Sequence, residues 1–219
     1  MAAQERTAQS VALSKAVFLP LAAAAFGAAG GLLVLLLPHN AGATAAVVFW
    51  SAATLARGER GVMRWFPKLP VFGSLLAGCT VLIRWYALAS FHDRRAVLAG
   101  VVAHELAAAG AVALAWVARP ADCEASQRLK GLNSASAILV LLQAGVVAAW
   151  TGPRTAFMLA LLVYLVVRLA LAFVNWRWGG VRWSDLNATF VLLSAVALAA
   201  LSLRYGGAIA PAEPVLRSR

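Results

Sequence analysis

The chain has 219 residues, of which 63% are hydrophobic and 12% are charged, and its mean hydropathy is +0.82. Soluble domains are roughly 45–50% apolar and about 25% charged, so the composition excludes a water-soluble fold and predicts side chains in contact with a lipid bilayer. The formal net charge of +11 indicates cationic loops at anionic headgroups, and we expect no nucleic-acid binding. Long apolar runs without period-two alternation predict helices and not a barrel.

In chain order these runs predict an all-α polytopic membrane bundle of about seven transmembrane helices. It forms one domain at residues 16–205, between a cytoplasmic segment at 1–15 and a polar tail at 206–219. The expected spans are 16–37, 43–55, 71–90, 96–117, 134–150, 155–174 and 186–203. The second is short for a bilayer whose crossing needs about 20 residues.

Lysine and arginine residues in the loops set the expected orientation. With a cytoplasmic N-terminus, eleven of them fall on the inner side and six on the outer side. The polar loops after the second, fourth and sixth spans then share the cytoplasmic face. Most tryptophans fall at predicted span ends, where indole rings act as interfacial anchors, and Trp50 and Trp65 are included in that interpretation.

Charged residues inside predicted spans mark candidate sites. Arg84 lies in the third span and Arg168 in the sixth, where an arginine at mid-bilayer costs roughly 2.5–3.5 kcal/mol on insertion scales. Each either faces the bundle interior or extends its long stem to water. His104 and Glu105 in the fourth span form either a structural pair or a partner for one of these arginines.

Two further regions suit an anionic ligand. One acid, Glu59, stands among basic residues that are able to bind phosphate directly or to act as a topology anchor. These are Arg57, Arg60, Arg64 and Lys68. At the start of the last span, Ser184 or Asp185 suits an N-cap, where backbone N–H groups favour an anion or simply begin a capped helix.

The order of these pieces resembles the cobalamin synthase family, the adenosylcobinamide-GDP ribazoletransferases. Phe18 to Gly30 is similar to the family's F-P-L-x-G-x-x-x-G-A opening, and Lys68 to Arg84 resembles an R-L-G-x-x-G turn that leads into a helix bearing a lysine. The stretch around His104 stands where the family has a Ser-Arg pair. Gly179 to Ala188 resembles G-G-x-T-G-D-x-L-G-A. The likeness covers nearly the whole chain.

The resemblance implies a transferase of cobalamin biosynthesis in the bacterial inner membrane. It would join adenosylcobinamide-GDP and α-ribazole, or its 5′-phosphate, to give adenosylcobalamin or its phosphate and GMP. Glu59 and Asp185 would be catalytic, with Glu59 holding Mg²⁺. The expected substrate-binding residues are Arg57, Arg60, Lys68, Arg84, Arg168 and Ser184. The alternatives are a catalytically lapsed homologue that serves as a partner of membrane cobamide-assembly enzymes, and a small-solute carrier.

Overall fold

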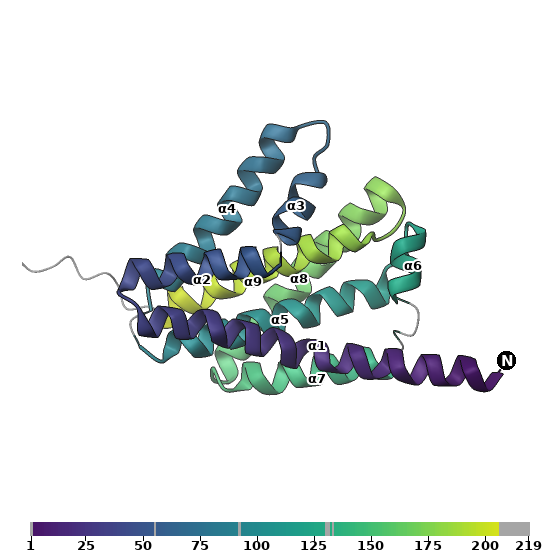
Figure 1. Cartoon of the computed structure of the whole chain (residues 1–219), viewed down its shortest axis with the longest axis horizontal. Helices are drawn as coiled ribbons and strands as arrows, with labels where there is room; N and C mark the ends of the chain where they lie inside the picture. Colours follow the sequence, from purple (N-terminus) through teal and green to yellow (C-terminus); the bar gives the residue numbers. More distant parts are fainter. Residues whose placement is uncertain (1, 55, 92, 130–131, 133, 206–219) are drawn as a thin grey trace, which may run out of the picture.

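The computed structural model describes residues 2–205 except 55, 92, 130, 131 and 133 (Figure 1). The predicted polar tail at 206–219 lies outside the described residues. Within them the chain is helical throughout and contains no strand. The helices are α1 (Ala2–Leu36), α2 (His39–Ala53), α3 (Arg57–Arg64), α4 (Pro70–Ala89), α5 (Arg95–Val117), α6 (Cys123–Leu129), α7 (Ser134–Ala149), α8 (Pro153–Trp178) and α9 (Trp183–Tyr205).

Five helices are long and apolar enough to cross a membrane: α4, α5, α8, α9 and the Phe18–Leu36 part of α1. The helix α7 is apolar but has 16 residues, and α2 has 15. The chain is thus a polytopic helical membrane protein, as its composition predicts. The total of seven spans and the cytoplasmic N-terminus stay predictions.

Three elements differ from those expected. The helix α1 begins at Ala2, so residues 2–15 of the expected polar segment continue the first span as helix. The expected loops at 57–70 and 118–133 contain the short helices α3 and α6. Neither short helix has a long apolar run, and in proteins most helical stability comes from tertiary packing, so composition alone does not reveal them.

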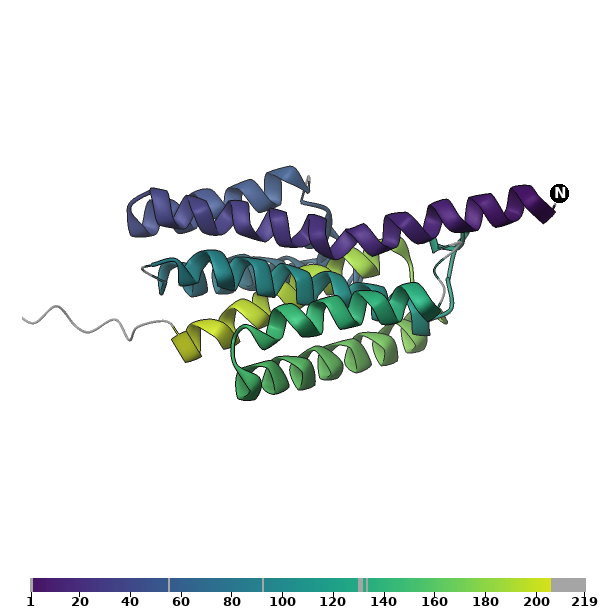
Figure 2. The same cartoon turned by 90° about the horizontal axis from the view of Figure 1, so that it is seen from below.

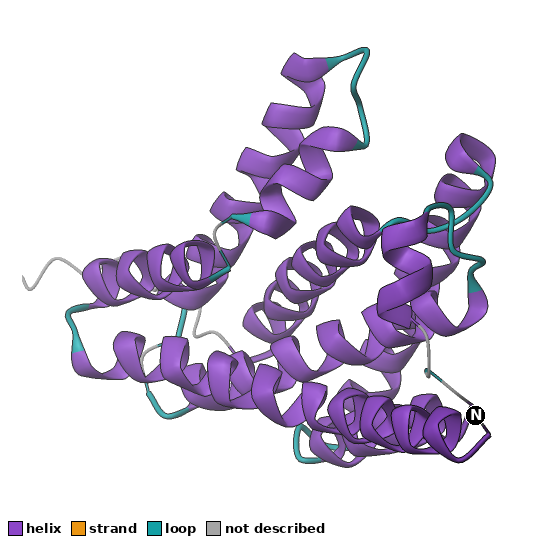
Figure 3. Ribbon diagram, turned by 45° about the vertical axis from the view of Figure 1, so that its right-hand side comes forward, coloured by secondary structure: helices purple, strands orange, loops and turns teal. Residues whose placement is uncertain are grey.

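The helix α5 forms the centre of the bundle. In Figure 2 it lies between α1 and α2 on one side and α7 and α8 on the other. Every residue from 102 to 110 is buried, so all faces of this stretch contact other helices. Figure 3 shows the helices joined by loops at the ends of the bundle.

Glycines allow α1 and α5 to approach at backbone distance. A Cβ added at Gly27 would lie 2.1 Å from the carbonyl oxygen of Gly100, and one at Gly100 would lie 2.3 Å from that of Gly27. Small residues at such crossings are typical of membrane helices, because packing there depends on close van der Waals contact.

The predicted polar loops lie together at one end of the bundle, which we call the polar end. The loops after α5 and α8 exchange backbone hydrogen bonds, from Ala121 N to Val181 O (2.9 Å) and from Val181 N to Arg119 O (2.7 Å). The loop after α3 joins them because Nε1 of Trp65, the residue that follows α3, donates a hydrogen bond to Asp185 in the first turn of α9. The grouping of the three loops is therefore confirmed, and their cytoplasmic placement stays a prediction.

Candidate functional site

The short helix α3 is held against the first turns of α9 by two glycines. A Cβ at Gly58 would lie 2.0 Å from Cγ2 of Val191, and one at Gly61 would lie 2.4 Å from the carbonyl oxygen of Ser184. Val62 is buried on α3 as well. Of the two residues between these glycines, Glu59 is buried inside the protein and Arg60 is exposed.

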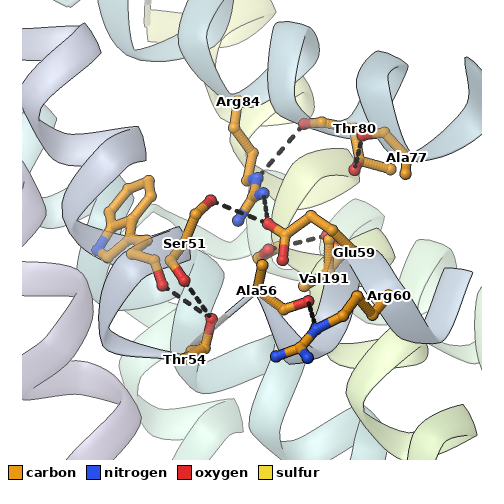
Figure 4. A network of polar contacts seen from close by, with 11 residues as sticks. Ser51, Thr54, Ala56, Glu59, Arg60, Ala77, Thr80, Arg84 and Val191 are labelled. Carbon is orange, nitrogen blue, oxygen red and sulfur yellow. Dashed lines mark hydrogen bonds and ion pairs between the residues drawn. The ribbon is translucent and has the colours of Figure 1, made fainter. Parts of the chain in front are cut away.

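Glu59 forms a buried ion pair with Arg84 of α4 (Figure 4). Glu59 is 6% exposed and Arg84 is 3% exposed. The hydroxyl of Ser51 on α2 donates to Oε1 of Glu59 at 3.1 Å, and Nε of Arg84 donates to the carbonyl oxygen of Thr80 at 3.4 Å. The pair therefore connects α2, α3 and α4 through charge-assisted contacts.

The pair lies beside a break between α2 and α3. The helix α2 ends at Ala53, and Ala56 adopts the left-handed conformation with φ of 51°, the one non-glycine residue among those described to do so. The N–H of Ala56 donates to the carbonyl oxygen of Ser51 at 2.7 Å, and the Thr54 hydroxyl donates to that of Trp50 at 2.9 Å. These bonds satisfy backbone groups that an interrupted helix would otherwise leave unpaired in lipid.

Asp185 has a structural environment at the start of α9. It is 0% exposed and accepts hydrogen bonds from Nε1 of Trp65 (3.0 Å) and from the backbone N–H of Arg182 (2.8 Å). The Arg182 side chain approaches the same carboxylate at 3.5 Å and stacks over Trp178. Both oxygens therefore have partners within the chain. Ser184 is half-buried beside Gly61 of α3.

The expected basic residues separate into two groups. Arg57 and Arg60 are exposed on α3, the helix that carries Glu59, and Lys68 is exposed in the loop that follows α3. Nε of Arg60 also donates to the carbonyl oxygen of Ala56 at 3.4 Å. Arg168, in contrast, is exposed on the outer surface of α8. The structure therefore brings Glu59 and Arg84 together and leaves Arg168 apart from them.

Arg84 pairs with Glu59, so the alternative in which His104 or Glu105 of α5 is its partner is not observed. His104 is buried among the rings of Phe26, Trp50 and Phe190, and its Nδ1 lies 2.9 Å from the carbonyl oxygen of Gly100. Trp50 is itself a buried core residue, 1% exposed, so its interpretation as an interfacial anchor is wrong.

Sequence reasoning missed three features of this site. It did not pair Glu59 with Arg84, it assigned no role to Ser51, and it read Trp65 as an anchor although that side chain is buried against Asp185. The pairing of Glu59 with Arg84 could have been found from the sequence, because a buried charge is tolerated only with a partner. An arginine inside a span therefore restricts the search to the chain's few acids.

The residues do not fit the magnesium ion that the resemblance implies. Mg²⁺ is usually held by carboxylates together with water and substrate phosphates. No group of three or more His, Cys, Asp or Glu side chains suited to a metal occurs within the described part of the chain. Oε1 of Glu59 is occupied by Arg84 and Ser51, and both Asp185 oxygens are engaged.

Comparison of the chain with protein-family models, with curated proteins and with solved structures finds no match.

Proposed function

We propose that the polar end of the bundle binds a phosphate-bearing ligand through arginine and lysine side chains, without a metal. One observation carries the proposal: α3 places its acid inward and its basic residues outward. Glu59 is buried against Arg84, while Arg57 and Arg60 on the same helix are exposed. The inward pair fixes the helix, and the outward guanidinium groups suit phosphate oxygens bidentately.

The resemblance supplies the most specific form of this proposal. The ligand is then adenosylcobinamide-GDP, bound at the cytoplasmic face of a bacterial inner membrane. In a transferase, the hydroxyl of α-ribazole or of its 5′-phosphate attacks the phosphorus linked to cobinamide. The phosphoanhydride bond breaks, GMP leaves, and the hydroxyl proton passes to a base. Glu59 is the candidate base, because its Oε2 is buried and has no hydrogen-bond partner among the described residues.

The acids of the site already have partners within the chain, which favours a ligand-binding protein over a transferase. Asp185 has partners for both oxygens, and Glu59 neutralises Arg84, so neither acid is poised for metal-dependent chemistry. The form we favour is a lapsed homologue. It holds the nucleotide-linked corrinoid at the membrane surface for other cobamide-assembly enzymes.

A binding experiment on the full chain in lipid nanodiscs tests the proposal. The probes are GDP and adenosylcobinamide-GDP, each with magnesium and with a chelator. We expect Arg57→Gln combined with Arg60→Gln to weaken binding at least tenfold, since a hydrogen bond to a charged group contributes about 1.5–3 kcal/mol. The matched control is Arg94→Gln combined with Arg154→Gln, two exposed arginines at the opposite end.

Each outcome has a distinct meaning. Binding that survives chelation without GMP release after α-ribazole is added supports the lapsed homologue. GMP release that requires Glu59 supports the transferase. Equal binding by the two double variants, or no binding of either probe by the unmodified chain, contradicts the proposal.

A small-solute carrier is a second candidate, favoured by the interruption between α2 and α3. Broken helices in carriers form ion and solute sites near the membrane midplane, and here Glu59, Arg84 and Ser51 meet beside the break. A small anion would compete with Glu59 for Arg84. Uptake of radiolabelled inorganic phosphate into proteoliposomes, abolished by Arg84→Gln, is the expected result. If uptake does not exceed that of protein-free liposomes, the chain is not a phosphate carrier.

A further inference from the structure

Arg168 lies on the outer face of α8, well inside the span. It stands ten positions before Trp178, so it lies about 15 Å along the helix from that end. Its side chain is exposed, and no hydrogen bond or ion pair reaches it from the side chains that the structure describes. The arginine therefore faces away from the bundle at a depth normally filled by hydrocarbon.

Apolar side chains surround this arginine on the same face. Leu161, Tyr164, Leu165 and Leu169 are all more than half exposed, and they recur at the spacing of one helical face. Alone, such a surface suits lipid tails. A charged side chain in its middle is unfavourable there unless it is paired or hydrated, and Arg84 illustrates the paired arrangement inside the bundle.

None of the acids whose side chains are described would pair with Arg168 in a second copy. Among acids whose side chains the structure describes, Glu59, Glu105 and Asp185 are buried within the bundle. Asp93 and Asp122 are exposed, but they lie in loops at the ends of helices. A symmetric dimer through the outer face of α8 would bring arginine toward arginine. The described acids therefore do not supply the negative charge that Arg168 lacks.

We propose that the outer face of α8 packs against a transmembrane helix of another membrane protein, and that this helix carries an aspartate or glutamate near mid-bilayer depth. The carboxylate forms an ion pair with Arg168, while the leucines on either side pack against apolar residues of the partner. Polar residues on facing membrane helices commonly join them in this way. The surface is separate from the polar end and does not depend on the proposed ligand.

Association with model peptides in vesicles tests the charge requirement. The probes are two transmembrane peptides of about 20 leucines, one with a single central glutamate and one with leucine at that position. Energy transfer between labelled peptide and the labelled full chain reports association. We expect the glutamate peptide to bind about tenfold more tightly than the leucine peptide, corresponding to the strongest polar contacts measured between membrane helices.

Substitutions on α8 locate the contact. Arg168→Leu should remove the preference for glutamate, whereas Arg154→Leu, an exposed arginine in the first turn of the same helix, should retain it. Arg168→Lys provides a charged variant should the leucine variant insert poorly, and it should keep most of the preference. Equal association of both peptides with the unmodified chain is expected if the guanidinium reaches lipid phosphate instead. That outcome overturns the proposal, as does an unchanged preference in Arg168→Leu.

Discussion

Replacing Glu59 by glutamine tests the buried ion pair directly. Glutamine keeps the shape of the side chain but removes the negative charge, so Arg84 stays buried without a counter-ion. Breaking a buried pair by removing one partner costs about 3–5 kcal/mol, because the remaining charge has lost both water and its partner. Both side chains are buried, which places the pair in this class.

The expected loss is large enough to measure as a thermal shift. For a chain of this length, about 2–4 °C of unfolding temperature corresponds to each kcal/mol, so Glu59→Gln should lower the midpoint by roughly 6–20 °C. The measurement is thermal unfolding of the full chain in nanodiscs, followed by tryptophan fluorescence. The matched control is Asp93→Asn, which removes the exposed pair with Arg95, whose side chains are 56% and 60% exposed. An exposed pair contributes about 0–1 kcal/mol, so the unfolding midpoint of the control variant should hardly change.

A double variant separates the charge effect from general damage to the site. Glu59→Leu with Arg84→Met replaces both charges by apolar groups, and such replacements of buried pairs are often neutral or stabilising. The double variant should therefore unfold at a higher temperature than Glu59→Gln. If Glu59→Gln and Asp93→Asn lower the midpoint equally, or if the double variant is the least stable, the buried pair has no special role.

Three further substitutions test the packing and hydrogen bonds in the same unfolding assay. Gly100→Ala should destabilise by about 1–3 kcal/mol because its Cβ would meet the backbone of α1, whereas Gly78→Ala, with nothing within 4 Å, should be neutral or slightly stabilising; equal effects would contradict the close crossing. Trp65→Phe should lower the free energy of unfolding by about 1–3 kcal/mol because it leaves an oxygen of Asp185 unpaired. An unchanged stability would show that water replaces the indole donor. Ser51→Ala should cost about 1 kcal/mol alone and much less in the double variant that lacks Glu59, and an undiminished cost there would place its effect elsewhere.

The features that lipid dictates were predictable from the sequence. A bilayer requires long apolar helices, so composition alone places the spans of α4, α5, α8 and α9 to within a few residues. The grouping of the polar loops follows from alternation of the chain across the membrane. Trp50 shows where prediction from composition fails. Its position near the end of α2 suggests the membrane interface, but it lies in the core and donates a hydrogen bond to the carbonyl oxygen of Phe26.

The candidate site was predictable only in its residue types. Glu59, Arg57 and Arg60 were all recognised as chemically notable, but no periodic pattern shows that residues 57–64 form a helix. That helix depends on Gly58 and Gly61 meeting α9 more than 120 residues later, a contact that no local pattern contains. The outward direction of its arginines follows from this contact.

Arg84 and Arg168 show why the sequence could not separate an internal site from an external surface. Each is the one arginine within its expected span, and apolar residues occur on all sides of both helices, so no amphipathic period indicates the interior. The fold directs Arg84 toward Glu59 and directs Arg168 away from every acid whose side chain the structure describes. Both face the same cost of charge in hydrocarbon, but Glu59 balances the first, whereas none of the acids with described side chains balances the second. An arginine within an outward-facing apolar surface is therefore a better indicator of a partner than the apolar surface itself, which lipid alone satisfies.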